Sequence, residues 1–201
     1  MIALAPITWR GAPVPVITMW SGEADLRKPR VLRERWGGDR LLIIDDGVDA
    51  PGVGRPLFTR LHHGRCRRVV QARLCQICAQ PLGKACIAIS HGRTHAGHPL
   101  IRDGYPMHDA CAGRALTACP ALQRGITDRS LRCWLVPTGQ WARLWVKIGI
   151  ATGKDADERV NDMVRGTDGQ IVSGPDLVLL RHTPMRADDL MALAAMEDAG
   201  R

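Results

Sequence analysis

The sequence lacks the features that would place the chain in a membrane or outside the cell. No run of about 18 apolar residues occurs, so no transmembrane helix and no membrane partner are expected. Residues 1–10 have neither a basic start nor a long apolar stretch, so we expect no signal peptide. The seven cysteines are an odd number, which fits a reducing compartment better than a disulfide framework. We therefore expect a cytoplasmic protein.

Acidic residues are missing from the middle of the chain. Residues 50–102 contain no Asp or Glu, and residues 50–127 carry 11 basic and 2 acidic side chains, a net charge of +9. The whole chain has a net charge of +8, so the remaining residues sum to −1. Arginine outnumbers lysine 24 to 4, a bias that also accompanies a GC-rich genome. Localised positive charge is typical of a protein with a polyanionic partner.

Common catalytic signatures are missing as well. The sequence has no Ser/His/Asp constellation, no glycine loop of the phosphate-binding type and no dinucleotide-binding fingerprint. These absences favour a binding protein over an enzyme and leave the question of catalysis open.

Two pairs of soft metal ligands are the most informative motif that is present. Cys75 and Cys78 are separated by two residues, and so are His108 and Cys111. Such spacing lets each pair face one point, and two pairs can close a tetrahedron around one zinc ion. Cys111 falls in the first turn of an expected helix over residues 110–119, where the helix dipole favours a thiolate. We predict a structural zinc site.

The fourth ligand is the least certain member of this set. Alternatives to His108 are three loop histidines and one cysteine in an expected strand: His91, His95, His98 and Cys86. Cys119 is a poor alternative, because eight helical residues raise it about 12 Å above Cys111.

The pattern around the zinc motif predicts an α+β fold. We expect a small treble-clef-like zinc module, flanked by short antiparallel strands and followed by a C-terminal helix over residues 187–199. A basic helix is expected over residues 57–74, with arginines opposite its apolar stripe. Residues 31–36 fit a short helix or a loop. Residues 131–136 and 141–148 are expected to form a hairpin through Pro137 and Gly139.

Three segments are expected along the chain. Residues 1–49 form a strand-rich segment, residues 50–127 the basic zinc-finger-like module, and residues 128–201 an α+β segment. An alternative division joins 1–49 and 128–201 in one compact domain.

The zinc motif and its surroundings resemble a group of short proteins from streptomycete-type actinobacteria and from their phages and mobile elements. Two segments carry most of the resemblance, residues 74–81 (LCQICAQP) and 111–120 (CAGRALTACP), and shorter matches occur at 5–11, 20–22 and 54–56. The resemblance covers about the first two thirds of the chain. In that group the second metal pair is usually two cysteines, so His108 departs from the pattern. The resemblance implies a zinc module and a phage-like or actinobacterial origin, without an activity.

Three functions compete on this sequence. The first is a zinc-stabilised nucleic-acid-binding protein, with DNA favoured, whose phosphate contacts come from arginines of the expected basic helix: Arg60, Arg65, Arg67, Arg68 and Arg73. The second is a zinc-stabilised protein-interaction module that regulates a host protein, because a basic face also fits an acidic protein surface. The third is a nuclease of the HNH type, with His95, His98 and Asp103 as candidate catalytic residues. Ala112 weakens the third hypothesis, because zinc-containing members of that class usually place a histidine there.

Overall fold

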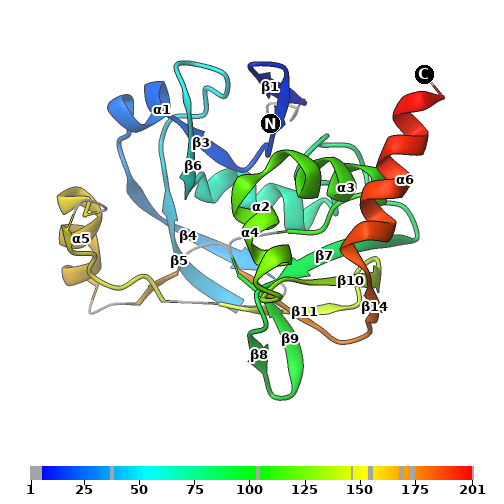
Figure 1. Ribbon diagram of the computed structural model, residues 1–201. Helices are drawn as coiled ribbons and strands as arrows, with labels where there is room; N and C mark the ends of the chain where they lie inside the picture. The colour runs from blue at the N-terminus through cyan, green and yellow to red at the C-terminus, as the bar shows by residue number, and fades with distance from the viewer. Residues whose placement is uncertain are drawn as a thin grey trace. The chain divides into compact units, whose positions relative to one another are not determined.

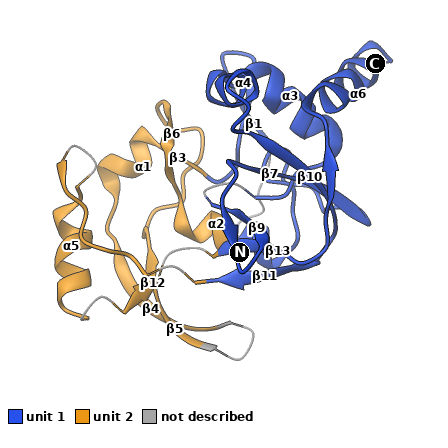
Figure 2. Ribbon diagram, turned by 60° about the horizontal axis from the view of Figure 1, so that its bottom comes forward, with its two compact units in different colours: residues 1–17, 68–144, 176–201 blue, residues 18–67, 145–175 orange. Residues whose placement is uncertain are grey.

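The computed structural model describes residues 6–36, 39–102, 105–145, 147–153, 156–167, 170–172 and 175–200. Short strands, mostly antiparallel, and α-helices alternate along this part of the chain, which confirms the expected α+β class (Figure 1). The chain forms two compact units (Figure 2). Unit 1 comprises residues 1–17, 68–144 and 176–201, and unit 2 comprises residues 18–67 and 145–175.

This division differs from the three consecutive segments expected from the sequence. The chain crosses between the units four times, so neither unit is a continuous segment. Helix α2 (His63–Gln71) begins in unit 2 and ends in unit 1. Composition changes along a chain cannot show such crossings, because they depend on which distant segments pair.

Unit 1 contains two antiparallel sheets and one hairpin. The sheets have the strand orders β14–β10–β7 and β11–β13–β9–β8, and the hairpin joins β1 and β2 through Arg10 and Gly11, both at positive φ. Its elements besides α2 are β1 (Ile7–Trp9), β2 (Ala12–Val14), β7 (Ala85–Ser90), β8 (Thr94–His95), β9 (His98–Ile101), α3 (Asp109–Ala118), α4 (Pro120–Thr127), β10 (Arg132–Pro137), β11 (Trp141–Leu144), β13 (Asp176–Leu179), β14 (Thr183–Met185) and α6 (Ala187–Ala199).

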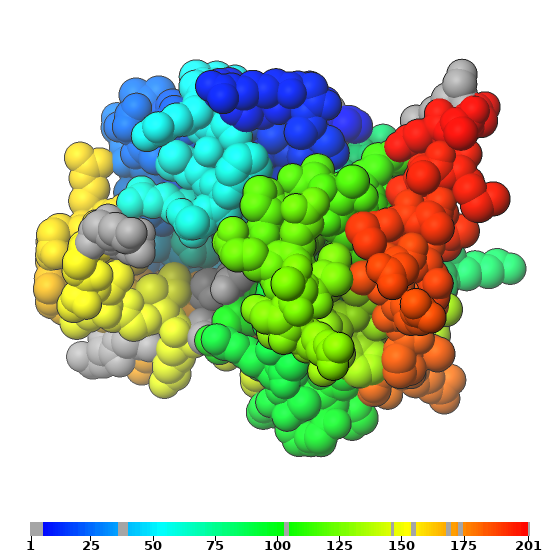
Figure 3. Space-filling view, viewed as in Figure 1, coloured from blue at the N-terminus to red at the C-terminus, as the bar shows by residue number. Residues whose placement is uncertain are grey.

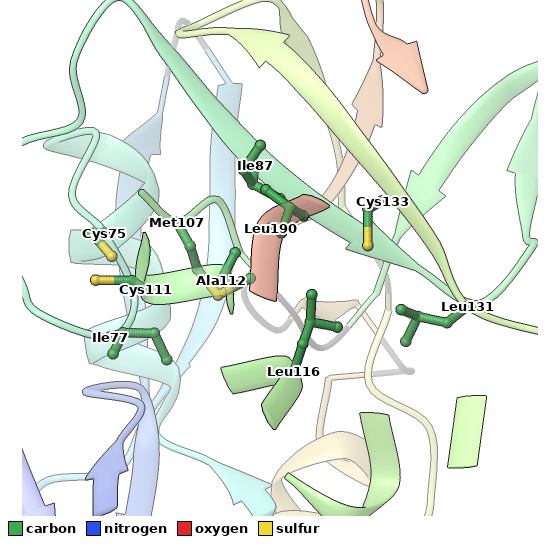
Figure 4. Packing of buried hydrophobic residues seen from close by; sticks show 10 residues of the cluster. All are labelled: Cys75, Ile77, Ile87, Met107, Cys111, Ala112, Leu116, Leu131, Cys133 and Leu190. Carbon is green, nitrogen blue, oxygen red and sulfur yellow. The ribbon is translucent and has the colours of Figure 1, made fainter. Parts of the chain in front are cut away.

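The core of unit 1 lies between its helices and strand β7. Ile87, Leu116 and Leu190 are almost fully buried there, and they come from β7, α3 and α6 (Figure 4). Helix α6 packs closely on α3 because Gly113 has no side chain. A Cβ at Gly113 would lie 2.1 Å from the carbonyl oxygen of Leu190 and 2.7 Å from the Cβ of Ala194. The C-terminal helix, which the sequence predicted, thus closes the core of the same unit that holds the cysteine pairs.

Unit 2 contains one three-stranded sheet and one two-stranded sheet. In the first, β12 pairs in parallel with β5 and β5 pairs in antiparallel with β4; in the second, β3 pairs with β6. Its core joins the sheet to α5 through Ile44, Val164 and Ile171. Its elements besides α2 are β3 (Thr18–Trp20), α1 (Ser21–Leu26), β4 (Arg30–Trp36), β5 (Asp39–Asp45), β6 (Pro56–Leu61), α5 (Glu158–Arg165) and β12 (Ile171–Val172).

Three local expectations are corrected by the structure. Residues 57–74 are not one helix, because β6 ends at Leu61 and α2 begins only at His63. Residues 31–36 lie in strand β4. The turn at Pro137 forms as expected, but β10 pairs with β7 and β14 while β11 pairs with β13, so the two strands are not a hairpin. In each case pairing with a distant strand decides the structure.

Two helices, α3 and α6, also differ in detail from what the sequence pattern predicts. Pro120 ends α3 as expected, but it also occupies the first turn of a further helix, α4. In α6 the residues Leu190 and Ala194 are buried as the periodicity suggests, whereas Leu193 is 44% exposed. None of the described helices is both long enough and apolar enough to cross a membrane.

Candidate metal centre

The structure brings together all four predicted metal ligands in unit 1. One ligand atom each from Cys75, Cys78, His108 and Cys111 lies within 4.8 Å of the others. Cys75 and Cys111 are buried, and Cys78 and His108 are partly exposed. The sulfur atoms of Cys75 and Cys111 point toward one another at the edge of the core (Figure 4). The prediction that these residues form one cluster is confirmed, and such a cluster can hold a metal ion.

The first two ligands lie on a tight turn of the backbone, residues 74–81. An isolated antiparallel bridge between Leu74 and Pro81 closes the turn, and the Cys75 N–H donates to the Gln80 carbonyl at 2.8 Å. The Ala79 N–H donates to the Cys75 carbonyl at 2.9 Å. Ala79 itself has φ of 59°, which a non-glycine residue adopts at a cost of about 1 kcal/mol. The backbone therefore accepts local strain to direct Cys75 and Cys78 to one point.

The other two ligands come from the start of α3. His108 is the N-cap of this helix, and Cys111 lies in its first turn, as the sequence predicted. A bridge between Ile87 and Met107 fixes the residue before His108 to β7. The Gln76 N–H also donates to the Pro106 carbonyl at 3.2 Å, which ties the turn directly to the segment that leads into α3. Backbone contacts thus position both ligand pairs.

The protonation of His108 follows from its neighbours. Its Nε2 lies 3.0 Å from the carbonyl oxygen of Pro81, and a carbonyl only accepts, so Nε2 carries the proton. In the neutral ring the other nitrogen, Nδ1, then has a free lone pair, and it lies 3.3 Å from the Cys78 sulfur. A hydrogen bond of this kind is the usual way in which a ligating histidine is oriented. His108 therefore presents Nδ1 to the cluster.

The three cysteine thiols do not behave alike. A hydrogen bond from Cys111, joined by N–H groups of Cys78, His108 and Ile77, lowers the pKa of Cys75 to about 5. The same bond raises the pKa of Cys111, because Cys111 is the donor. Burial, together with the negative charge of Cys75, raises the pKa of Cys78. Negative charge therefore concentrates on Cys75, and a cation in the cluster would stabilise all three thiolates.

The alternative ligands do not join this cluster. Cys86 is buried in β7, where burial raises the pKa of its thiol to about 11. His95 and His98 face each other across β8 and β9, and His91 is exposed before that hairpin. Within the described residues no metal-capable group of three or more ligands includes these histidines. Asp103, the third candidate residue of the nuclease hypothesis, lies outside the described residues.

The arginines expected to contact nucleic acid lie in different environments. The guanidinium of Arg65 is fully buried and donates to Glu23 and Asp49 at 2.5 Å and 2.7 Å. Arg67 is buried as well and donates to the Ile44 carbonyl at 2.7 Å. Both guanidinium groups are used inside unit 2, so neither can reach a phosphate. The expected exposed basic face of α2 is corrected in this respect: Arg60 and Arg68 are half-buried, and only Arg73 is exposed.

A second polar centre, which the sequence did not indicate, surrounds Arg65. Glu23, Asp49 and His62 bring ligand atoms within 4.8 Å of one another, a spacing that could suit a metal. Arg65 already supplies a cation there, because it donates to both carboxylates and to the Thr18 carbonyl. Burial alone would raise the pKa of Glu23, but the hydrogen bonds and charge of Arg65 hold it below its ordinary value. We interpret this centre as a structural ion-pair network.

No local sequence signal could have found this network. Arg65 lies 42 residues from Glu23 and 16 from Asp49.

Comparisons with protein-family models, with curated proteins and with solved structures each found no match to the chain. The function is therefore inferred from the sites themselves.

Proposed function

We propose that this chain is a zinc-stabilised nucleic-acid-binding protein, with DNA as the favoured ligand. The observation that carries the proposal is the closed cluster of three cysteines and one histidine in the more basic of the two units. Three sulfurs and one imidazole nitrogen are a ligand set that zinc takes in tetrahedral structural sites. Four protein ligands leave no position for a substrate, so the metal would stabilise the fold and would not act in catalysis.

The order of elements supports a treble-clef-like module around this ion. The turn with Cys75 and Cys78 comes first, strands β7, β8 and β9 follow, and α3 with Cys111 comes last. Tetrahedral zinc with sulfur and nitrogen ligands at about 2.3 and 2.1 Å separates its ligand atoms by about 3.5–3.8 Å. The spacing of 3.3 Å between Cys78 Sγ and His108 Nδ1 is close to that range. Zinc would thus join the turn to the helix.

The surface charge of unit 1 supports the nucleic-acid part of the proposal. The unit has 14 basic and 8 acidic residues, a net charge of +6, against +2 for unit 2. Arg73 and Lys84 are exposed on either side of the zinc turn. The backbone carbonyl of Lys84 accepts a hydrogen bond from the Thr138 N–H. A Cβ at Gly139 would lie 3.2 Å from Cζ of Arg73, so the turn at residues 138–139 contacts both basic residues. Within the described residues neither side chain forms an ion pair, which leaves both charges available to phosphates.

Metal analysis of the purified, tag-free protein tests the first half of the proposal. We expect one zinc ion per chain, and substitution by cobalt should give the visible absorption of a tetrahedral site with thiolate ligands. A protein that folds fully and carries no stoichiometric metal would contradict it.

Fluorescence anisotropy across a salt series tests the second half. Labelled duplex DNA, single-stranded DNA and RNA are titrated with the zinc-loaded protein, with duplex DNA expected to bind best. Each lost phosphate contact reduces the salt slope by about 0.9, so Arg73→Gln with Lys84→Gln should flatten it by about 2. The matched control is Arg165→Gln with Arg186→Gln, which removes two exposed charges that are already paired with Asp162 and Asp188. No binding at low salt would refute the nucleic-acid assignment.

One observation favours a second candidate, a protein-interaction module. Helix α6 leaves Leu193 and Met196 exposed, at 44% and 72%, and Figure 3 shows this helix (red) at the surface. Asp188 and Asp189 lie in the first turn of this helix, whereas Glu197 and Asp198 of its last turn pair with Arg114, so the fitting partner is an amphipathic helix with basic residues at one end. Capture of such a partner from a nuclease-treated lysate should then depend on Leu193 and Met196. Capture that is unchanged after both become glutamate would exclude this surface.

A further inference from the structure

Three arginines gather on one face of the β4–β5 hairpin in unit 2. In this antiparallel pair Arg33 lies opposite Leu42 and Arg35 lies directly opposite Arg40. Residues that face each other across antiparallel strands share one side of the sheet, and side chains alternate along each strand. Arg33, Arg35 and Arg40 therefore share one face, and all three are exposed.

The inner part of the same face is anchored in the core of unit 2. Val31 and Ile44 are paired across the strands, and Ile44 is fully buried against Val164 and Ile171. Along this face the paired side chains are therefore aliphatic at Val31 and Ile44, next to the core, and both are arginines at Arg35 and Arg40, farther from it. Strand β12 pairs with β5 only at Leu42 and Ile43, so the outer part is a two-stranded ribbon. Figure 2 shows this ribbon extending beyond the rest of unit 2.

Among the residues whose side chains the structure describes, none forms an ion pair with Arg33, Arg35 or Arg40. The carboxylates of Glu34 and Asp45 belong to the opposite face, where they pair with Arg67 at 3.9 Å and with Arg30 at 2.9 Å. Like charges directly opposite each other destabilise a sheet. An anion between Arg35 and Arg40 would remove that repulsion.

We propose that this arginine face binds the phosphate backbone of duplex DNA at the major groove. The inference rests on the proposed function for its class of ligand, and it names a contact surface in unit 2 that is made of residues other than Arg73 and Lys84. The major groove of B-form DNA admits a two-stranded ribbon. The major groove of duplex RNA is too deep and narrow for side chains to enter. Arg33 and Arg35 are spaced by about 6.6 Å along one strand, so each can reach a different phosphate.

The sequence alone did not indicate this surface, because the positive charge of the chain is concentrated in residues 50–127. Residues 30–45 contain four arginines and three acidic residues, and their net charge of +1 conceals the sorting of charge between two faces. Only the strand register separates the unpaired arginines from the paired ones.

The test uses the zinc-loaded full chain and a short labelled DNA duplex of mixed sequence. We expect the triple variant Arg33→Gln, Arg35→Gln, Arg40→Gln to bind roughly tenfold or more weakly near physiological salt, and to flatten the salt slope by about 2.7. The triple Lys variant should keep the slope. The matched control is Arg30→Gln, Arg165→Gln, Arg186→Gln, which removes three exposed charges that are already paired. It should change affinity much less.

Stability provides a second readout that a purely structural role would not give. The triple Gln variant loses a repulsion, so its melting temperature should equal or exceed that of the unchanged protein while its affinity falls. A lower melting temperature together with unchanged affinity would overturn the inference.

The outcomes separate this inference from the proposed function. If the unchanged protein binds no duplex at any salt concentration, the proposed function fails. If it binds and the triple Gln variant binds equally well, the inference about the hairpin fails alone. If duplex RNA binds as tightly as duplex DNA and depends equally on the three arginines, the assignment to the major groove is overturned.

Discussion

The two units of this molecule each bury a cluster of acidic or acid-forming side chains, and they differ in where the neutralising cation comes from. In unit 2 the cation is part of the chain, because Arg65 donates to Glu23 and Asp49. In unit 1 the corresponding group within the described residues consists of Cys75, Cys78, Cys111 and His108, and it contains no lysine or arginine. The first centre is complete when the chain folds, whereas the second could take a metal ion from solution.

This difference separates a candidate metal site from an ion-pair network that has the same spacing of ligand atoms. Both clusters satisfy the geometric condition of ligand atoms within 4.8 Å. Of the two clusters, only the cysteine cluster has no positively charged side chain bound to its acidic groups, whereas Arg65 donates to both carboxylates of the other. The hydrogen bonds around each cluster, more than the distances within it, separate the two interpretations.

The largest expected effect is the loss of the proposed zinc ion from unit 1. Cys75→Ser or a strong chelator should remove zinc and unfold the zinc module, because structural zinc sites contribute on the order of 10 kcal/mol. Hydrogen exchange should then rise sharply in β7 and α3. Cys119→Ser is the matched control, because Cys119 is partly exposed and lies outside the cluster. Unchanged protection of α3 in the metal-free protein would contradict the comparison between the units.

The next effect is the loss of the internal cation from unit 2. Arg65→Met leaves Glu23 buried without its partner, and breaking a buried pair in this way costs about 3–5 kcal/mol. Urea unfolding should show that loss while the zinc content stays at its original value. Arg30→Met, at an exposed arginine of the same unit, should cost far less. A variant at Arg65 that loses zinc but keeps its stability would reverse the assignment of the two centres.

A smaller and graded effect should follow acidification of unit 2. Burial and Arg65 lower the pKa of His62, so the unfolded chain takes up a proton near pH 6.5 that the folded chain resists. The pKa of Asp46 is also lowered, by His63, His62 and Arg27 against the opposing effect of burial. Stability is therefore complete above about pH 6.5, and falls first through His62 and again below about pH 4 through the carboxylates.

Thermal melts between pH 8 and pH 3, with zinc content measured at each pH, check this order. Exchange in residues 18–67 reports unit 2 separately from acid release of the metal. The His62→Asn variant should lack the loss near pH 6.5. A stability that stays constant from pH 7.5 down to pH 5 would contradict the role of His62.

The smallest effect concerns the turn that carries the first ligand pair. Ala79→Gly should stabilise the protein by about 0.5–1 kcal/mol, because glycine adopts the positive φ of this position without strain. The same change at Ala192, in the middle of α6, should destabilise by about 1 kcal/mol. Urea unfolding of both variants, compared at equal zinc loading, measures the difference. A destabilising Ala79→Gly change would show that the turn is not strained.

The sequence predicted the metal cluster well because each ligand pair is local. A spacing of two residues fixes the geometry of Cys75 with Cys78, and a helix start fixes Cys111, whatever the rest of the chain does. The α+β class and the helix over residues 187–199 were predicted for the same reason, from periodic patterns within single elements.

The sequence failed where distant segments decide the environment of a residue. Arg65 and Arg67 lie opposite the apolar stripe of their helix, so local periodicity placed them in solvent. Carboxylates and carbonyls from other parts of unit 2 cover that side, and the two arginines became part of the interior. The same cause explains β10 and β11, which share a turn and join different sheets.

The packing of Gly113 against α6 has a consequence for synthesis of the chain on the ribosome. Helix α3 ends at Ala118 and α6 begins at Ala187, so the surface of α3 that receives Leu190 is made about 70 residues before its cover. At roughly 5–20 residues per second this delay lasts about 4–14 s. During that interval the apolar side of α3 is open to other chains, and a metal ion bound early at Cys111 would be the strongest constraint holding the helix in place.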